Sequence, residues 1–223
     1  MPQLRLSKSA INQAIMAFEV SWSPTTGFAT YNKKYARPVV PDPINTDSGV
    51  TVGIGYDCSV MSSAKIIKDW SSVLPADMVT SLSKCAGLKK QAAVGALQTV
   101  KNVFVSIEAA LQVFYNNTIF SYSKQALSIY PNIINIHPIE ASVIVSLVYN
   151  RGSALEGDRR REMKQLVGAI NRDNDKEMAD LIRSMCRLWP NTKGLQIRRK
   201  AEAALIEMAD TPLPEEDILT INI

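Results

Sequence analysis

The chain has 223 residues, of which 46% are hydrophobic, and a formal net charge of +4. This length is enough for one domain with a sound core, and no apolar run approaches the roughly 20 residues that a membrane span needs. The basic N-terminus is not followed by an apolar stretch and a cleavage site, so we expect no secretory signal peptide. The three cysteines are odd in number and show no C-x-x-C spacing, which argues against a disulfide framework or a zinc site.

The first predicted element is a helix over residues 8–19, capped by Ser7. Its apolar positions recur at helical spacing: Ile11, Ala14, Ile15 and Phe18. Glu19 closes this helix, where the helix dipole disfavours negative charge and so suits a group that donates a proton. A surface glutamate at a fraying helix end is the simpler interpretation of this position.

Residues 20–50 carry mostly turn and loop signals. The run Ser23–Gly27 has turn chemistry, and residues 28–31 read as a short strand. Residues 33–44 hold three prolines and several basic side chains, which predicts an irregular loop. Residues 45–49 predict a second turn.

The stretch VTVGIGYD, residues 50–57, is β-branched and twice interrupted by glycine. As one strand it would hold Thr51 and Asp57 about 20 Å apart. If the chain turns at Gly53 and Gly55, which tolerate positive φ, the two side chains face each other across a hairpin at about 5 Å. The alternative is a plain buried strand with two packing glycines.

The remaining chain predicts helices and an extended tail. Cap signals, among them Ser62 or Ser63 and Ser106, and apolar periodicity predict these helices at 63–70, 75–85, 88–103, 107–130, 139–149, 158–171, 174–189 and 195–210. The helix over 139–149 is apolar all round and begins at Pro138, so we expect it to be the buried central helix. We predict a single domain, with a small α/β lobe over 1–60, a helical lobe over 61–210 and a tail over 211–223.

Two carboxylates on either side of a cleft are what glycoside hydrolysis requires, and Glu19 and Asp57 form the best pair in the chain. Thr51 could hold the attacking water. The single histidine, His137, precedes a proline at a helix start and is expected to be a local cap or a surface residue rather than a catalyst. The run Asp158–Glu162 predicts a solvated helix start, with phosphate binding as the alternative. It lacks the interleaved aromatic residues typical of nucleic-acid binding.

Three motifs together resemble the phage lysozyme superfamily, nearest its pesticin-like muramidases. The first is Phe18-Glu19 followed by T-x-G-x-G-x-D over residues 51–57. The second is Tyr149-Asn150-Arg151-Gly152, and the third is the G-L-x-x-R-R-x-x-E pattern of residues 194–202. Their order spans almost the whole chain.

The resemblance implies a lysozyme-like α+β fold, with a small antiparallel sheet lobe and a mainly helical lobe around a buried helix. It also implies hydrolysis of the MurNAc–GlcNAc β-1,4 bond of peptidoglycan. A threonine-held water between two separated carboxylates predicts inversion, and we expect no cofactor or metal. Glu19 matches the family's general acid, and Asp57 and Thr51 match its pesticin-type aspartate and threonine. Substrate contacts are expected from four further residues: Tyr56, Gly53, Gly55 and Asn150.

The chain also departs from the family. Common phage lysozymes place the aspartate before the threonine, where this chain has Asn45, and many carry a histidine in place of Tyr56. Residues 20–50 form an insertion. Arg198 and Arg199 are expected to make ion pairs rather than bind substrate.

We expect a monomer that is made in the cytoplasm and reaches the periplasmic wall by phage lysis or a secretion system. Its partners would be glycan strands and, for a secreted effector, an immunity protein, with no nucleic acid and no membrane insertion. A lytic transglycosylase and a non-catalytic glycan-binding module remain as alternatives.

Overall fold

The computed structural model describes residues 2–223, which group into two compact units. Unit 1 combines the described residues up to Phe18 with Phe120–Ile223, and unit 2 is the continuous segment Glu19–Ile119. The lobe boundary predicted near residue 60 falls inside unit 2, because the helices after that point pack with the hairpin before it. Helices with two small antiparallel sheets make this an α+β chain, as predicted.

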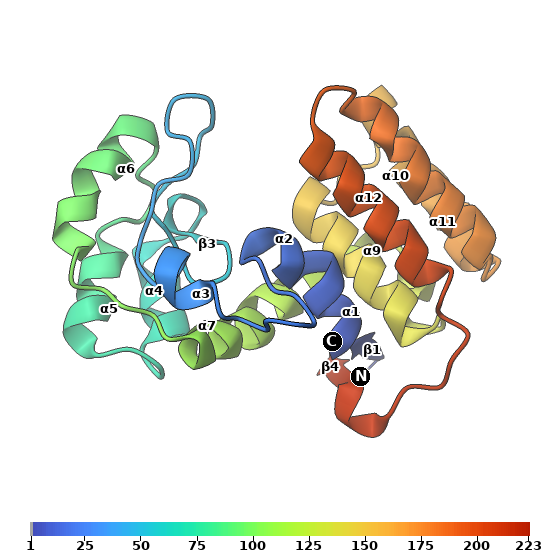
Figure 1. Ribbon diagram of the computed structural model, residues 1–223, viewed down its shortest axis with the longest axis horizontal. Helices are drawn as coiled ribbons and strands as arrows, with labels where there is room; N and C mark the ends of the chain where they lie inside the picture. The colour runs from blue at the N-terminus through green and yellow to red at the C-terminus, as the bar shows by residue number, and fades with distance from the viewer. Residues whose placement is uncertain (1) are drawn as a thin grey trace. The chain divides into compact units, whose positions relative to one another are not determined.

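Unit 1 begins with a strand and the predicted helix over 8–19 (Figure 1). The strand is β1 (Gln3–Ser7), and the helix comprises α1 (Lys8–Ile11), the π-helical η1 (Asn12–Met16) and α2 (Ala17–Glu19). The Ser7 hydroxyl accepts a hydrogen bond from the Ala10 N–H at 3.1 Å, which is the predicted cap.

The rest of unit 1 is helical up to a final strand. Its elements are α8 (Phe120–Ile129), η5 (Pro131–Ile134), α9 (Pro138–Arg151), η6 (Asp158–Arg160), α10 (Arg161–Asn171), α11 (Asp175–Ser184), η7 (Met185–Leu188), α12 (Lys193–Ile206), η8 (Glu215–Asp217) and β4 (Ile218–Asn222). The predicted extended tail is β4, which pairs antiparallel with β1 in the register Gln3↔Asn222 to Ser7↔Ile218.

Helix α9 is the buried central helix that its composition predicts, with every residue from Glu140 to Val148 buried. It packs against α1, α8, α12 and β1. The His137 side chain accepts a hydrogen bond from the Ile139 N–H, and Glu140 accepts one from the His137 N–H, so His137 is the cap that was predicted. Gly152 ends the helix with a φ of 74°.

A buried ionic cluster joins α9 to α12 and confirms the expected role of the arginine pair. Arg199 Nη2 lies 2.9 Å and Arg198 Nε 3.3 Å from the Glu202 carboxylate, and all three side chains are buried. Ser146 of α9 donates a hydrogen bond to the same carboxylate at 2.8 Å.

Unit 2 surrounds a hairpin with short helices (Figure 1). Its elements are α3 (Tyr31–Lys34), β2 (Thr51–Val52), β3 (Tyr56–Asp57), η2 (Cys58–Val60), α4 (Ser63–Trp70), α5 (Ala76–Ser83), α6 (Lys90–Ala96), η3 (Leu97–Val100), α7 (Ile107–Val113) and the π-helical η4 (Phe114–Ile119). Ser62 and Ser106 cap α4 and α7, as predicted.

The strand predicted over 28–31 is wrong. The N–H groups of Ala29 and Tyr31 bond locally to the carbonyls of Thr26 and Phe28, so the chain makes consecutive turns that lead into α3. The loop that follows returns to the hairpin, where Val39 and Thr51 exchange two backbone hydrogen bonds of 3.0 and 2.7 Å. This pairing ties the loop over residues 33–44 to strand β2 of the hairpin.

The three cysteines are free thiols, with Cys58 and Cys85 buried. Within residues 2–223, no helix combines the length and the apolar character that crossing a bilayer requires.

Candidate active site

The VTVGIGYD stretch forms the predicted hairpin. Thr51 and Asp57 are register partners across β2 and β3, and Val52 is paired with Tyr56. Gly53 and Gly55 have φ values of 59° and 65°. This left-handed conformation strains residues with a side chain, so the two glycines are what allows the chain to turn within three residues.

The side chains of Thr51 and Asp57 both bind the backbone of Gly49. The Thr51 hydroxyl donates to the Gly49 carbonyl at 3.3 Å, and the Gly49 N–H lies 3.2 Å from Asp57 Oδ1. Asp57 Oδ1 also accepts from the Ser59 N–H at 2.8 Å, which caps η2. Backbone amides therefore orient the Asp57 carboxylate on a rigid hairpin, and the side chain remains half-buried.

Gly49, which the sequence predicts only as part of a turn, also contributes to this site. A Cβ at this position would lie 2.4 Å from Ser59 Cβ and 2.5 Å from the Leu88 carbonyl oxygen. It would also lie 2.9 Å from Asp57 Oδ1. Only glycine lets the backbone approach the carboxylate this closely.

Glu19 is the last residue of α2, as predicted, and the first residue of unit 2. Its side chain is half-buried rather than fully exposed. Glu19, Thr51 and Asp57 thus belong to the same compact unit, and the hairpin brings two of the three together.

Tyr56, predicted to contact substrate, lies in the core of unit 2 instead. Its side chain is 4% exposed, and its ring packs edge-on against Trp70 with centroids 5.3 Å apart. The hydroxyl donates to Asp69 Oδ2 at 2.9 Å, and Lys65 forms an ion pair with the same buried carboxylate. Burial and the Asp69 hydrogen bond raise the pKa of Tyr56, so the phenol stays neutral.

The two hairpin glycines differ in their surroundings. Gly53 is buried, and a Cβ there would lie 3.3 Å from both Trp70 Cη2 and Ala110 Cβ. Gly53 therefore serves packing rather than the predicted substrate contact. Gly55 is exposed at the tip of the hairpin, where a ligand can reach its backbone.

Two further aspartates, Asp42 and Asp47, lie between Glu19 and Asp57 in the sequence, and each interacts with a nearby residue instead. Asp42 accepts hydrogen bonds from the backbone and side chain of Asn45 within an exposed turn. Asp47 is exposed and lies 3.0 Å from Lys90 Nζ, and this hydrogen bond and the lysine charge lower its pKa.

Asn150 belongs to unit 1, at the end of α9, where it lines a pocket of about 520 Å³. Trp189 lies on the wall of this pocket with Arg151 stacked 4.9 Å above its ring. The run Asp158–Glu162, predicted to be a solvated helix start, forms η6 and the first turn of α10. The prediction is wrong for Glu162, which is buried and lies 2.6 Å from Arg187 Nε.

Positive charge is in excess around this pocket. Its two acids already have partners, since Glu156 pairs with Lys164 and Asp158 with Arg187. No ion pair among the described residues involves its three lining arginines, Arg151, Arg159 and Arg160. Burial and the neighbouring guanidinium groups lower the pKa of Arg151 to about 10. The pocket therefore suits an anionic group.

No protein-family model matches this chain, and no curated protein is recognisably similar to it. The chemistry of the site therefore has to come from the residues themselves.

Proposed function

We propose that the chain is a muramidase with a lysozyme-like fold, which hydrolyses the MurNAc–GlcNAc β-1,4 bond of peptidoglycan. The observation that supports this most directly is the pairing of Thr51 with Asp57 across the glycine turn. It fixes a hydroxyl and a carboxylate on neighbouring rigid strands, and rigid elements hold reacting groups better than loops.

In the proposed reaction, Glu19 protonates the glycosidic oxygen as the bond to the anomeric carbon breaks. Asp57 takes a proton from a water molecule, and that water attacks the anomeric carbon from the opposite face. The Thr51 hydroxyl positions the water. Such an arrangement inverts the configuration and requires carboxyl groups roughly 6.5–9.5 Å apart.

Asn150 and the arginine-lined pocket are proposed to bind carboxylates of the peptide stems. An Asn150→Ala variant should then raise KM for peptidoglycan and leave kcat close to that of the wild type. A loss of kcat at unchanged KM would remove Asn150 from substrate binding.

We further propose that the protein acts on the wall in the periplasm, either as a phage endolysin or as a delivered antibacterial effector. An effector would require an immunity protein in the producing cell.

The decisive experiment is lysis of purified peptidoglycan by the wild type and four single variants. Glu19→Gln and Asp57→Asn should each lower kcat by roughly 10²-fold or more, since each removes an acid or base. Thr51→Ala should lose less. Asp47→Asn is the matched control, because it removes an exposed carboxylate close by in sequence and should stay active. Lysis by Glu19→Gln at the wild-type rate would refute the assignment.

A lytic transglycosylase is the second candidate, and the contacts of Asp57 favour considering it. Its carboxylate caps η2 and binds Gly49, so it has a structural task that needs no catalytic role. A transglycosylase uses one acid and releases 1,6-anhydro products. Mass spectrometry of the fragments separates the two reactions, and NMR of the first-formed anomer reports inversion. Absence of any cleavage would leave the non-catalytic glycan-binding module.

A further inference from the structure

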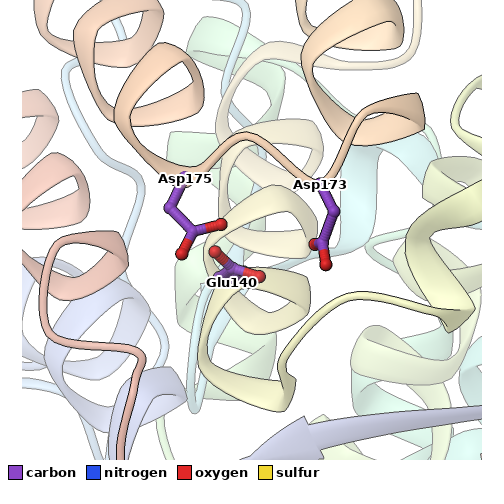
Figure 2. Close-up of side chains that lie close together, drawn as sticks. All are labelled: Glu140, Asp173 and Asp175. Carbon is purple, nitrogen blue, oxygen red and sulfur yellow. The ribbon is translucent and has the colours of Figure 1, made fainter.

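Three carboxylates of unit 1 converge outside the candidate active site. Glu140 lies in the first turn of α9, Asp173 lies in the turn that joins α10 to α11, and Asp175 is the first residue of α11 (Figure 2). One oxygen from each residue lies within 4.8 Å of the others. Figure 2 shows the three groups directed toward a common point between the helices.

The central carboxylate is buried and lacks a partner on one side. Glu140 is 1% exposed, and its Oε2 accepts a hydrogen bond from the His137 N–H at 3.0 Å. Its Oε1 is buried without a hydrogen-bond partner. Such an oxygen is costly to bury, and here it faces two further acids instead of a donor.

The basic residues that flank this turn do not neutralise the cluster. Arg172 binds Glu177 at 2.7 Å, and Lys176 binds Asp180 at 2.7 Å. Acids near helix N-termini are individually favourable, which accounts for Glu140 and Asp175 one at a time. It does not account for their convergence or for the unpartnered Oε1.

We propose that Glu140, Asp173 and Asp175 form a binding site for a divalent cation, and that the bound ion is Ca²⁺. A cation placed among the three groups would bind Glu140 Oε1 and offset the mutual repulsion of the carboxylates. Burial, and after it the neighbouring carboxylates of Asp175 and Asp173, raise the pKa of Glu140 to about 8.

The ligand chemistry selects the ion. All three donors are carboxylate oxygens, which hard cations prefer, whereas Zn²⁺ sites favour nitrogen and sulfur. Asp173 is exposed and Asp175 half-exposed, so the ion has an open approach and can keep water ligands on that side. Ca²⁺ accepts this variable geometry, while Mg²⁺ demands near-ideal octahedral coordination.

The test has two parts. Calorimetry measures the heat as Ca²⁺ is titrated into the metal-free protein, and thermal unfolding is measured with and without CaCl₂. With a Kd on the order of 10⁻⁴ M, 5 mM CaCl₂ should raise Tm by roughly 5 °C. MgCl₂ at the same concentration should raise it less. The variant Asp173→Asn should bind Ca²⁺ at least about tenfold more weakly and lose most of the Tm shift.

Two further variants keep the result interpretable. Glu140→Gln retains an oxygen for the His137 N–H and should fold, yet lose Ca²⁺ binding. Asp210→Asn removes an exposed acid outside the cluster and should respond to Ca²⁺ as the wild type does. The proposal is overturned if the wild type shows neither binding heat nor a Tm shift at 5 mM CaCl₂, or if Asp173→Asn and Glu140→Gln respond like Asp210→Asn.

Discussion

Two buried glutamates of unit 1 have opposite surroundings. Glu202 on α12 is fully buried, and its Oε1 contacts two arginines and a serine hydroxyl, so opposite charges offset its own even though its Oε2 has no hydrogen-bond partner. Glu140 on α9 is equally buried but faces two aspartates. Burial raises the pKa of both groups, and only at Glu202 do Arg199 and Arg198 act against it.

The difference separates a carboxylate that completes the core from one that needs something from outside the chain. A compensated buried charge becomes strongly destabilising only when its partner is removed. An uncompensated one destabilises the folded chain until a proton or a cation arrives.

The largest effect is expected at Glu202. Replacing it with glutamine removes the charge that the buried Arg199 guanidinium contacts at 2.9 Å, which should lower the free energy of unfolding by about 3–5 kcal/mol. Urea denaturation measures the change. Glu207→Gln, which removes an exposed carboxylate bound to Arg183, is the control and should change little. If the two variants were equally stable, the contacts between Glu202 and the buried arginines would not contribute the stability that their distances indicate.

The second effect concerns Asp57, a carboxylate held by backbone amides. Gly49→Ala pushes a methyl group against Ser59 and the Leu88 carbonyl and should destabilise unit 2 by about 2 kcal/mol. Gly95→Ala is a control of opposite sign, because a Cβ there meets nothing within 4 Å on a helix and should stabilise by about 0.5–1 kcal/mol. If thermal unfolding showed that both substitutions raise Tm, or that both lower it, the close packing around Gly49 would be contradicted.

The third effect tests Asp69, whose buried carboxylate is shared between a phenol and a lysine. Tyr56→Phe removes one hydrogen bond while Lys65 remains, so the loss should be about 1 kcal/mol. Because Tyr56 lies in the core, KM for peptidoglycan should not change. A raised KM with unchanged stability would return Tyr56 to the substrate-binding role expected from the sequence.

The fourth effect is the pH dependence that Glu140 confers in calcium-free buffer. Its pKa is raised on folding from 4.5 to about 8 by burial and by Asp175 and Asp173, so the folded state holds the proton more tightly. Stability from this group is present below pH 4.5 and is lost as pH rises toward 8. Glu140→Gln should flatten this decline, as measured by Tm against pH with EGTA present. A wild-type decline that persists in the variant would have another origin.

Local signals account for the parts of the fold that the sequence predicted. The caps at Ser7, Ser62 and Ser106 and the apolar run after Pro138 act within a few residues of the helices they define. The hairpin was predictable for the same reason, since Gly53 and Gly55 adopt the positive φ that its turn requires.

What the sequence missed depends on contacts between distant residues. β1 was not predicted because its partner, β4, lies near the other end of the chain. The acid cluster was missed because Glu140 meets Asp173 and Asp175 only when α9 packs near the α10–α11 turn, and no metal-ligand spacing marks it. The hydroxyl of Tyr56 donates to Asp69, thirteen residues further along the chain. The motif over residues 51–57 does not include Asp69, so it could not predict that Tyr56 is buried.

The antiparallel pairing of β1 with β4 has a consequence for how the chain folds during synthesis. Unit 2 is one continuous segment, so it can fold before ribosomal synthesis of the chain is complete. Unit 1 must wait for residues 218–222, whose strand also brings Asp217 to the start of α1, where it accepts hydrogen bonds from Ser7 and Ser9. Strand β1 therefore stays without its partner β4 until residues 218–222 have been synthesised. Joining residues 222 and 3 through a short linker and opening the chain in an exposed loop would make unit 1 continuous and let it fold earlier.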